Sequence, residues 1–283
     1  MKALVLSSGA SHAAFQAGAL MALDETGWSP DVVLGSSSGA INAAAWVSGL
    51  TGKEIADLWR KIKTRNVYKW RPVSDWLKIF SWNYVFDTSP LRSFLKEHLH
   101  LPSVYSSDKV LLVSGVEVET GKQRIFSSKV GKTYDFLQSY FTITPFDHES
   151  ILSSSAIPGI FPWVNGVWDG AFQQTNPLKP VVQMGATEIV IIHMDVNYRA
   201  TLPNGIIETA SRILEISSSY RLVADIELLR RRNCLPEYRF IDVTVISPQC
   251  PLGYSKLDFN SDMKGDVINI GYKAAKSELT NIE

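Results

Sequence analysis

The feature that most constrains the fold is a layout that occurs twice at the start of the chain: a short apolar segment, a tight turn and an alanine-rich segment. The first unit combines an apolar strand at Lys2–Leu6 with a helix that runs to about Leu23. In the second, Asp31–Leu34 predicts a strand, Gly35–Gly39 a sharp turn and Ala40–Val47 a helix. Strands that alternate with helices favour a mostly parallel sheet covered on both faces. We therefore predict a three-layer α/β/α fold.

Further elements follow along the chain, and none of them suggests an internal repeat. The Asn165–Gly166 dipeptide between apolar residues predicts a tight hairpin. We expect one domain over residues 1–283, with a small cap inserted at about 64–88, where tryptophans occur without clear periodicity. The other predictions are helices at 51–63 (a capping box at Thr51 and Glu54), 89–98 (N-cap Ser89), 176–185, 206–232 and 267–279, a hairpin of strands 109–118 and 123–126, and strands 188–194 and 240–246.

Composition excludes several classes of protein. Forty-five per cent of the 283 residues are hydrophobic and 20% are charged, which is typical of a globular protein with a large core. Lys plus Arg number 28 and Asp plus Glu number 28, so we expect no nucleic-acid partner. The two cysteines match no metal or redox spacing. The apolar run at the start is too short for a signal peptide, so we expect a cytoplasmic protein.

The segment Gly35-Ser36-Ser37-Ser38-Gly39 satisfies the pattern G-x-S-x-G between a strand and a helix. In such a turn the central serine, Ser37, is forced into an unfavourable backbone conformation, and Gly35 and Gly39 leave room for the strand and the helix to approach. The start of the helix beneath Ser37 would place unpaired amides and a positive dipole end near developing negative charge. Ser37 is therefore a candidate nucleophile, and a serine-rich loop that only caps a helix is the alternative.

A serine nucleophile needs a base, and the sequence offers two candidates. The order Ser37, Asp169, His193 matches that of α/β-hydrolases, but only one strand precedes the Ser37 strand, and His193 lies in an apolar run typical of a buried structural histidine. Asp169 follows the predicted hairpin, and Gly170 lets the chain turn away after it. In a dry site the pKa of its carboxyl rises, so that it can accept a proton. An exposed turn aspartate is the alternative interpretation.

Three segments together resemble the patatin-like phospholipase family. They are Leu6–Gly18, the Gly35–Gly39 turn, and Ser155–Pro162 leading to Asp169-Gly170-Ala171 and Asn176-Pro177; Asp87–Leu91 and Gly271-Tyr272 are weaker matches. The resemblance implies a Ser37–Asp169 dyad without histidine. It implies hydrolysis of an acyl ester in a lipid or phospholipid through an acyl-enzyme, with no metal or cofactor.

One departure from the family concerns the loop that supplies the oxyanion hole, here Gly9, Ala10 and Ser11. The family pattern is G-G-G-x-R-G, of which only the middle glycine survives as Gly9, and His12 replaces the arginine. Loss of one oxyanion donor costs about 3–4 kcal/mol, or roughly 10²–10³ in rate. A catalytically weak or silent protein that binds lipid or regulates a partner is therefore the alternative function.

Two further interpretations concern binding. A nucleotide-binding turn after the first strand is disfavoured, because Ser8, Ala10 and Ala13 stand where that motif needs glycine. Tryptophans such as Trp76 and Trp82 in the expected cap suggest peripheral contact with a membrane, with ordinary packing as the alternative. The sequence does not predict an oligomeric state.

Overall fold

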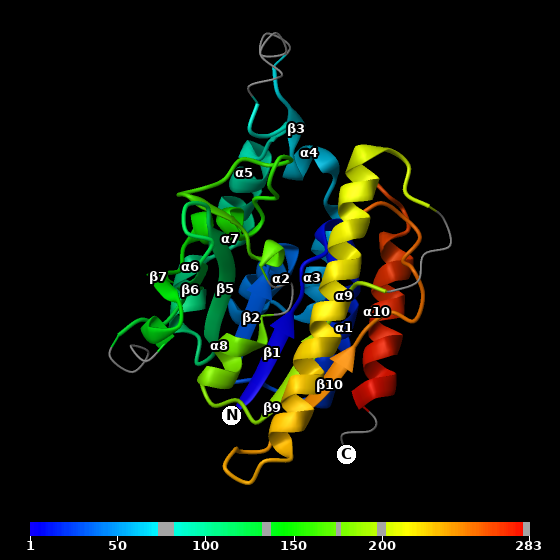
Figure 1. The fold of residues 1–283 in the computed structure, drawn as a ribbon. Coiled ribbons are helices and arrows are strands. Elements are labelled where there is room, and N and C mark those ends of the chain that lie inside the picture. Colours follow the sequence, from blue (N-terminus) through cyan, green and yellow to red (C-terminus); the bar gives the residue numbers. More distant parts are fainter. Residues whose placement is uncertain (73–81, 132–136, 174–176, 197–201, 280–283) are drawn as a thin grey trace.

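A mostly parallel sheet forms the centre of the computed structural model, which describes residues 1–72, 82–131, 137–173, 177–196 and 202–279 (Figure 1). The strand order is β10-β9-β1-β2-β5-β6-β7, and the first five of these strands are parallel. The strands are β1 (Lys2–Leu6), β2 (Val32–Ser36), β5 (Val110–Glu117), β6 (Gln123–Ser127), β7 (Thr142–Pro145), β8 (Val167–Asp169), β9 (Glu188–Ile192) and β10 (Asp242–Ile246).

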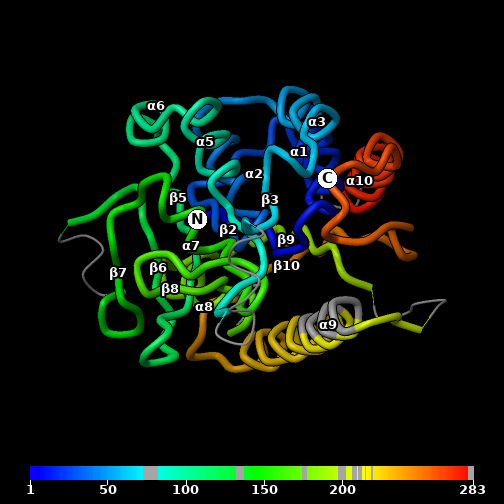
Figure 2. Tube along the Cα trace, turned by 90° about the horizontal axis from the view of Figure 1, so that it is seen from above, coloured from blue at the N-terminus to red at the C-terminus, as the bar shows by residue number. Residues whose placement is uncertain are grey.

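Helices cover both faces of this sheet, which confirms the predicted three-layer architecture (Figure 2). Alternate residues of the strands point to opposite faces: Leu4 and Val33 belong to one apolar core, and Ala3 and Leu34 belong to the other. The first core is closed by α1 (Ala14–Thr26), α2 (Ser38–Val47), α3 (Gly52–Lys61), α5 (Ser89–His98), α7 (His148–Ser154) and α10 (Lys264–Leu279); the second is closed by α8 (Leu178–Gln183) and α9 (Gly205–Asn233).

The short-range predictions agree with the observed elements, with one shift. Strands β5 and β6 form the expected antiparallel hairpin, and Asn165 and Gly166 have φ of 53° and 70°, as the tight turn requires. The capping box at Thr51 is present. The N-cap of α5 is Thr88 and not Ser89, because the Asp87 carboxylate accepts the Ser89 amide (2.7 Å) and draws Ser89 into the first turn. Asn176, the expected start of α8, lies outside the described residues.

The segment expected to form a cap contains α4 (Thr64–Val67) and a small antiparallel ribbon of β3 (Lys69–Trp70) and β4 (Phe86–Asp87). The ribbon extends away from the central sheet at the edge where the parallel strands end (Figure 1). Residues 73–81, including Trp76, lie outside the described part of the chain. The cap and the single-domain organisation remain predictions.

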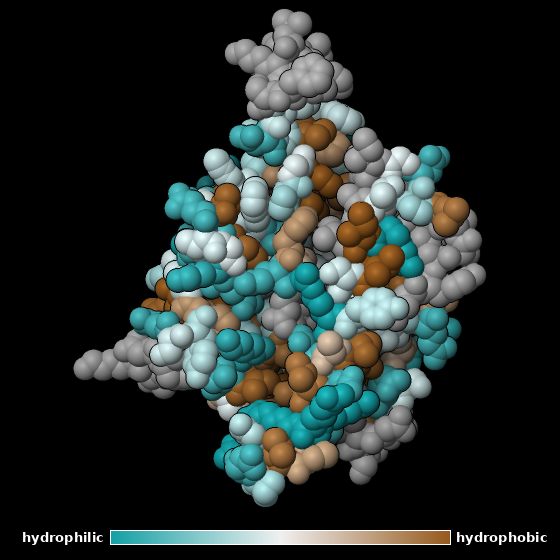
Figure 3. All heavy atoms as spheres, viewed as in Figure 1, coloured by the Kyte–Doolittle hydropathy of each residue, from teal (hydrophilic) through white to brown (hydrophobic). Residues whose placement is uncertain are grey.

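Helix α9 is apolar on two sides. Leu222 packs into the second core, whereas Ile213, Ile216 and Val223 are exposed. Hydrophobic side chains are visible along α9 on the face seen in Figure 3. This exposure does not amount to a membrane span: among the described residues, no helix is both long and apolar enough to cross a bilayer.

Candidate active site

Ser37 lies at the junction where β2 ends and α2 begins. Its backbone has φ 56° and ψ −126°, an unfavourable conformation for a residue other than glycine, and only 5% of the residue is exposed. The turn is tight because α2 approaches β1 closely: a Cβ on Gly39 would lie 2.4 Å from the Leu6 carbonyl oxygen. Gly35 is equally confined, since a Cβ there would lie 2.5 Å from Ala40 Cα. Ser37 therefore lies at the end of the sheet where the parallel strands have their carboxyl ends.

Asp169 reaches the same place through the edge of β5. Strand β2 pairs with β5 up to the partners Ser36 and Ser114 and then stops. Further along β5, β8 takes over the same edge in antiparallel direction, with Asp169 opposite Gly115, because β6 occupies the other edge. The register therefore places Asp169 beside the residue that follows Ser36. The structure brings Ser37 and Asp169 together.

The Asp169 carboxyl is buried, with 2% of the residue exposed. Burial raises its pKa to about 7, although interactions with the Ser37 hydroxyl and with the Ala171 amide, which donates to Oδ1 (2.8 Å), favour the charged form. The Asp169 amide donates to the Ala156 carbonyl (3.0 Å), which ties the carboxyl to the segment after α7. Near neutral pH this group can therefore both accept and return a proton.

Ser154 is a residue of the site that the sequence did not reveal. The Ser37 amide donates to Ser154 Oγ (2.8 Å), and Ser154 is fully buried at the end of α7. This contact holds the strained turn against a helix that lies far away in the sequence. The only signal was the serine run 153–155, which overlaps the start of the Ser155–Pro162 segment.

The loop after β1 lies next to the Ser37 turn, because β1 and β2 are neighbouring parallel strands. Ala10 begins the short helix η1 (Ala10–Ala13) with φ 50°, in the left-handed region that favours glycine. Within the described residues, the amides of Gly9 and Ala10 donate to no protein acceptor. The Ser11 amide, in contrast, donates to the Lys256 carbonyl (2.9 Å). Two of the three expected donors therefore have no acceptor among the described residues.

The model of the patatin-like phospholipase family matches residues 4–182, which is more than half of the chain and includes the elbow, the loop and Asp169. The chain belongs to the patatin-like phospholipase family. Comparison with curated proteins gave no match.

The fold is similar to that of one solved structure, VipD, and two ExoU structures are more distant matches. VipD from Legionella pneumophila is 13% identical, with a TM-score of 0.50; the alignment covers 99% of this chain and 67% of VipD. The type III effector ExoU is 14% identical, with a TM-score of 0.48; the alignment covers 99% of this chain and 52% of ExoU. ExoU of Pseudomonas aeruginosa in complex with SpcU is 15% identical, with a TM-score of 0.47 and the same coverage. The patatin-like chain thus spans about half the length of ExoU.

The conformation of Ala10 explains why this family has glycine in the loop, and it leads to a prediction. Substituting Ala10→Gly removes a left-handed strain of about 1–2 kcal/mol at the cost of about 0.5–1 kcal/mol in chain entropy. We expect a melting temperature that is unchanged or slightly raised, and an esterase rate that is equal or up to a few-fold higher. Thermal unfolding and steady-state kinetics measure both. A marked fall in rate would show that the loop is aligned wrongly with the family pattern.

His193, the alternative base, follows β9 and is separated from the Ser37 strand by β1. Burial lowers its pKa, and its charge state depends on Asp195 and Lys256. The structure thus brings Asp169, and not His193, next to Ser37. His12, which replaces the family arginine, is buried and donates through Nε2 to the Tyr254 carbonyl (2.8 Å).

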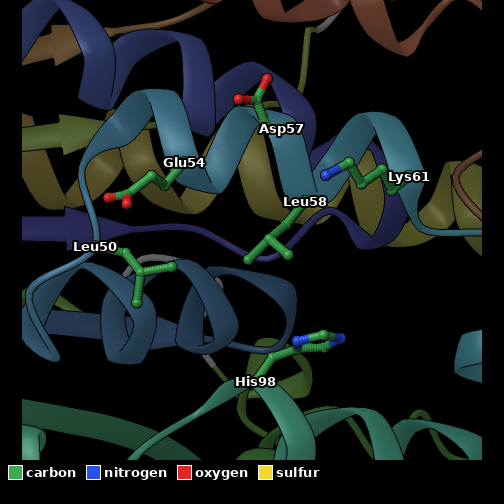
Figure 4. A pocket seen from close by; sticks show the side chains of 6 residues that line it. All are labelled: Leu50, Glu54, Asp57, Leu58, Lys61 and His98. Atoms are coloured by element: carbon green, nitrogen blue, oxygen red, sulfur yellow. The ribbon is translucent and has the colours of Figure 1, made fainter.

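A shallow cavity of about 270 Å³ lies between α3 and the end of α5, lined by Leu50, Glu54, Asp57, Leu58, Lys61 and His98 (Figure 4). Its carboxylates already have partners, since Glu54 belongs to the capping box and Asp57 pairs with Arg60 (2.6 Å). Among the described residues, no group of His, Cys, Asp and Glu is arranged to hold a metal ion.

Proposed function

We propose that this protein is a serine lipid acyl hydrolase that uses a Ser37–Asp169 dyad. The observation that carries the proposal is the buried Asp169 carboxyl, with a pKa raised to about 7, which interacts with the hydroxyl of a serine in a strained turn. A carboxyl of this pKa is suited to general-base work at neutral pH. Membership of the patatin-like phospholipase family supports a lipid ester as the substrate.

The proposed reaction proceeds in two halves. Asp169 accepts the Ser37 hydroxyl proton while Oγ attacks the ester carbonyl carbon, and the Gly9 and Ala10 amides with the start of α2 stabilise the oxyanion. Collapse of this intermediate breaks the bond to the alcohol, which leaves with the proton from Asp169. Asp169 then takes a proton from water, which attacks the acyl-enzyme and releases the fatty acid. Ser37 Oγ departs and recovers its proton from Asp169.

The proposal includes peripheral contact with a lipid surface through the β3–β4 ribbon. Trp70 on β3 is 60% exposed and packs edge-on against Phe86 (4.6 Å between ring centroids). Arg71 lies over the ring of Trp82 (4.9 Å). An exposed indole beside a cation suits the interface between headgroups and acyl chains. The ribbon extends from the edge of the sheet that carries Ser37, so this contact would bring the site to its substrate.

Replacing Trp70 by alanine is expected to lower the fraction of protein that floats with phospholipid vesicles about three-fold, because an interfacial indole is lost. Tyr238→Ala serves as the control. Tyr238 is 46% exposed and precedes β10, so it lies at the amino ends of the parallel strands, away from the β3–β4 ribbon. Equal flotation of native protein and Trp70→Ala would remove the ribbon from the proposal.

The experiment that tests the function is a panel of p-nitrophenyl esters and phospholipids, combined with a fluorophosphonate probe. We expect release of fatty acid and covalent labelling of one serine, located at Ser37 by peptide mass spectrometry. A native protein that neither hydrolyses any ester nor reacts with the probe would support the silent, lipid-binding alternative.

A further inference from the structure

A segment near the end of the chain holds the loop that carries the proposed oxyanion donors. Residues Tyr254–Lys256 lie between β10 and α10 and contact Ser11 and His12, directly after Ala10. The Lys256 carbonyl accepts the Ser11 amide (2.9 Å), and the Ser255 carbonyl accepts the Ser11 hydroxyl (3.2 Å). The Tyr254 hydroxyl donates to the Ser11 carbonyl (2.9 Å). The amide, the hydroxyl and the carbonyl of Ser11 are thus all hydrogen-bonded to one segment.

His12 adds a second connection to the same segment. Its Nε2 donates to the Tyr254 carbonyl (2.8 Å), and its ring meets the Tyr254 ring edge-on, with centroids 4.8 Å apart. The residue that replaces the family arginine is therefore engaged in holding the loop and is not directed at solvent, with 8% of its surface exposed.

Lys256 anchors the segment to the core of the sheet. Its ammonium group pairs with Asp195, which follows β9 and is 7% exposed, and it lies 3.6 Å from Glu215 on α9. Strand β9 is the direct neighbour of β1, from which the loop departs. The loop and its support are therefore fixed to adjacent strands, so that their relative position is set by the sheet.

We propose that Tyr254–Lys256 is a positioning clamp that aims the Gly9 and Ala10 amides at the ester oxygen. The inference rests on the proposed function. Ala10 stands at φ 50° without the freedom of glycine, and such a conformation persists only where surrounding contacts over-determine it. Oxyanion donors act only when they are held in place before the charge develops. The clamp would hold the loop in this conformation, and its residues lie outside 4–182, the range of the family match.

The variant Tyr254→Phe tests the clamp, because it removes the hydrogen bond to Ser11 and keeps the ring against His12. We expect kcat to fall about ten-fold with KM within two-fold of native, since the lost interaction supports the transition state and not substrate binding. The matched control is Tyr105→Phe, which removes a similar bond from a tyrosine hydroxyl to the Phe146 carbonyl (2.5 Å), away from the site. We expect that variant to retain native kinetics and to show a similar change in melting temperature.

Hydrogen–deuterium exchange gives a readout that does not depend on activity. We expect faster exchange of the amides of residues 11–13 in Tyr254→Phe and native rates there in Tyr105→Phe. Unchanged exchange in Tyr254→Phe, or an equal loss of kcat in both variants, would overturn the clamp. If the native protein shows no esterase activity, the proposed function fails, and the exchange measurement alone decides whether the segment holds the loop.

Discussion

Replacing Ser37 by alanine is expected to lower ester hydrolysis by about 10⁴-fold or more, because Ser37 is the nucleophile that we propose and removal of a serine nucleophile has effects of this order. The fold should remain intact, since alanine differs from serine only by the missing hydroxyl. The turn is held by the close packing at Gly35 and Gly39 and by the bond from the residue 37 amide to Ser154, which the substitution leaves in place. Steady-state kinetics with a p-nitrophenyl ester measures the loss, and circular dichroism with thermal unfolding checks the fold.

The neighbouring serine offers a matched control for this variant. Ser36 Oγ is buried and has no hydrogen-bond partner among the described residues, so Ser36→Ala should be neutral or slightly stabilising and should keep native activity. Substantial hydrolysis by the Ser37→Ala protein, at a rate near that of Ser36→Ala, would contradict the assignment of Ser37 as nucleophile.

Replacing Asp169 by asparagine is expected to reduce kcat by at least about 10², the range in which general bases contribute. The native protein should become more active as pH rises through about 7, because the pKa of Asp169 is raised to about 7 and the base must be ionised. The asparagine variant should lose this dependence. The His193→Ala variant discriminates between the two candidate bases: retained activity in Asp169→Asn together with loss in His193→Ala would assign the role to the histidine.

The raised pKa of Asp169 makes the folded protein less stable as pH rises. A carboxylate in an ion pair has a lowered pKa and the opposite effect. The folded-state pKa of Asp169, about 7, lies above the ordinary pKa of an aspartate, 3.8, so the folded state binds more protons and stability falls as pH rises between these values. The asparagine variant cannot ionise there. At pH 8 we expect it to be more stable than native, by up to about 4 kcal/mol. Chemical denaturation at pH 5 and pH 8 measures the difference; greater stability of the native protein at pH 8 would contradict the raised pKa.

Much of the fold follows from local patterns in the sequence. The spacing of hydrophobic residues and the residue types in the turns are sufficient to predict the two strand–turn–helix units, the β5–β6 hairpin and the Asn165–Gly166 turn. Each of these depends on residues close together in the chain. The Ser37 and Asp169 candidates arose in the same way, from a strand before each residue and glycine beside it. The family resemblance joined them into one site.

The remaining parts of the site depend on contacts that no local pattern reports. Ser154 looks like any serine at the end of a helix until α7 is placed beside the Ser37 turn. The engagement of the Ser11 amide with Lys256 joins residues from opposite ends of the chain. Ala10 conflicts with the expected glycine in the sequence, and only its backbone angle shows that the conformation is retained with a different residue.

The shared edge of β5 also bears on how the protein is made. Because β2 and β8 occupy consecutive stretches of one strand, the elbow is synthesised well before the segment that completes the edge. At usual rates of translation the delay is on the order of ten seconds. During this time the growing chain carries Ser37 without Asp169, the proton acceptor that we propose, so under this proposal a ribosome-bound fragment would not hydrolyse the lipids around it.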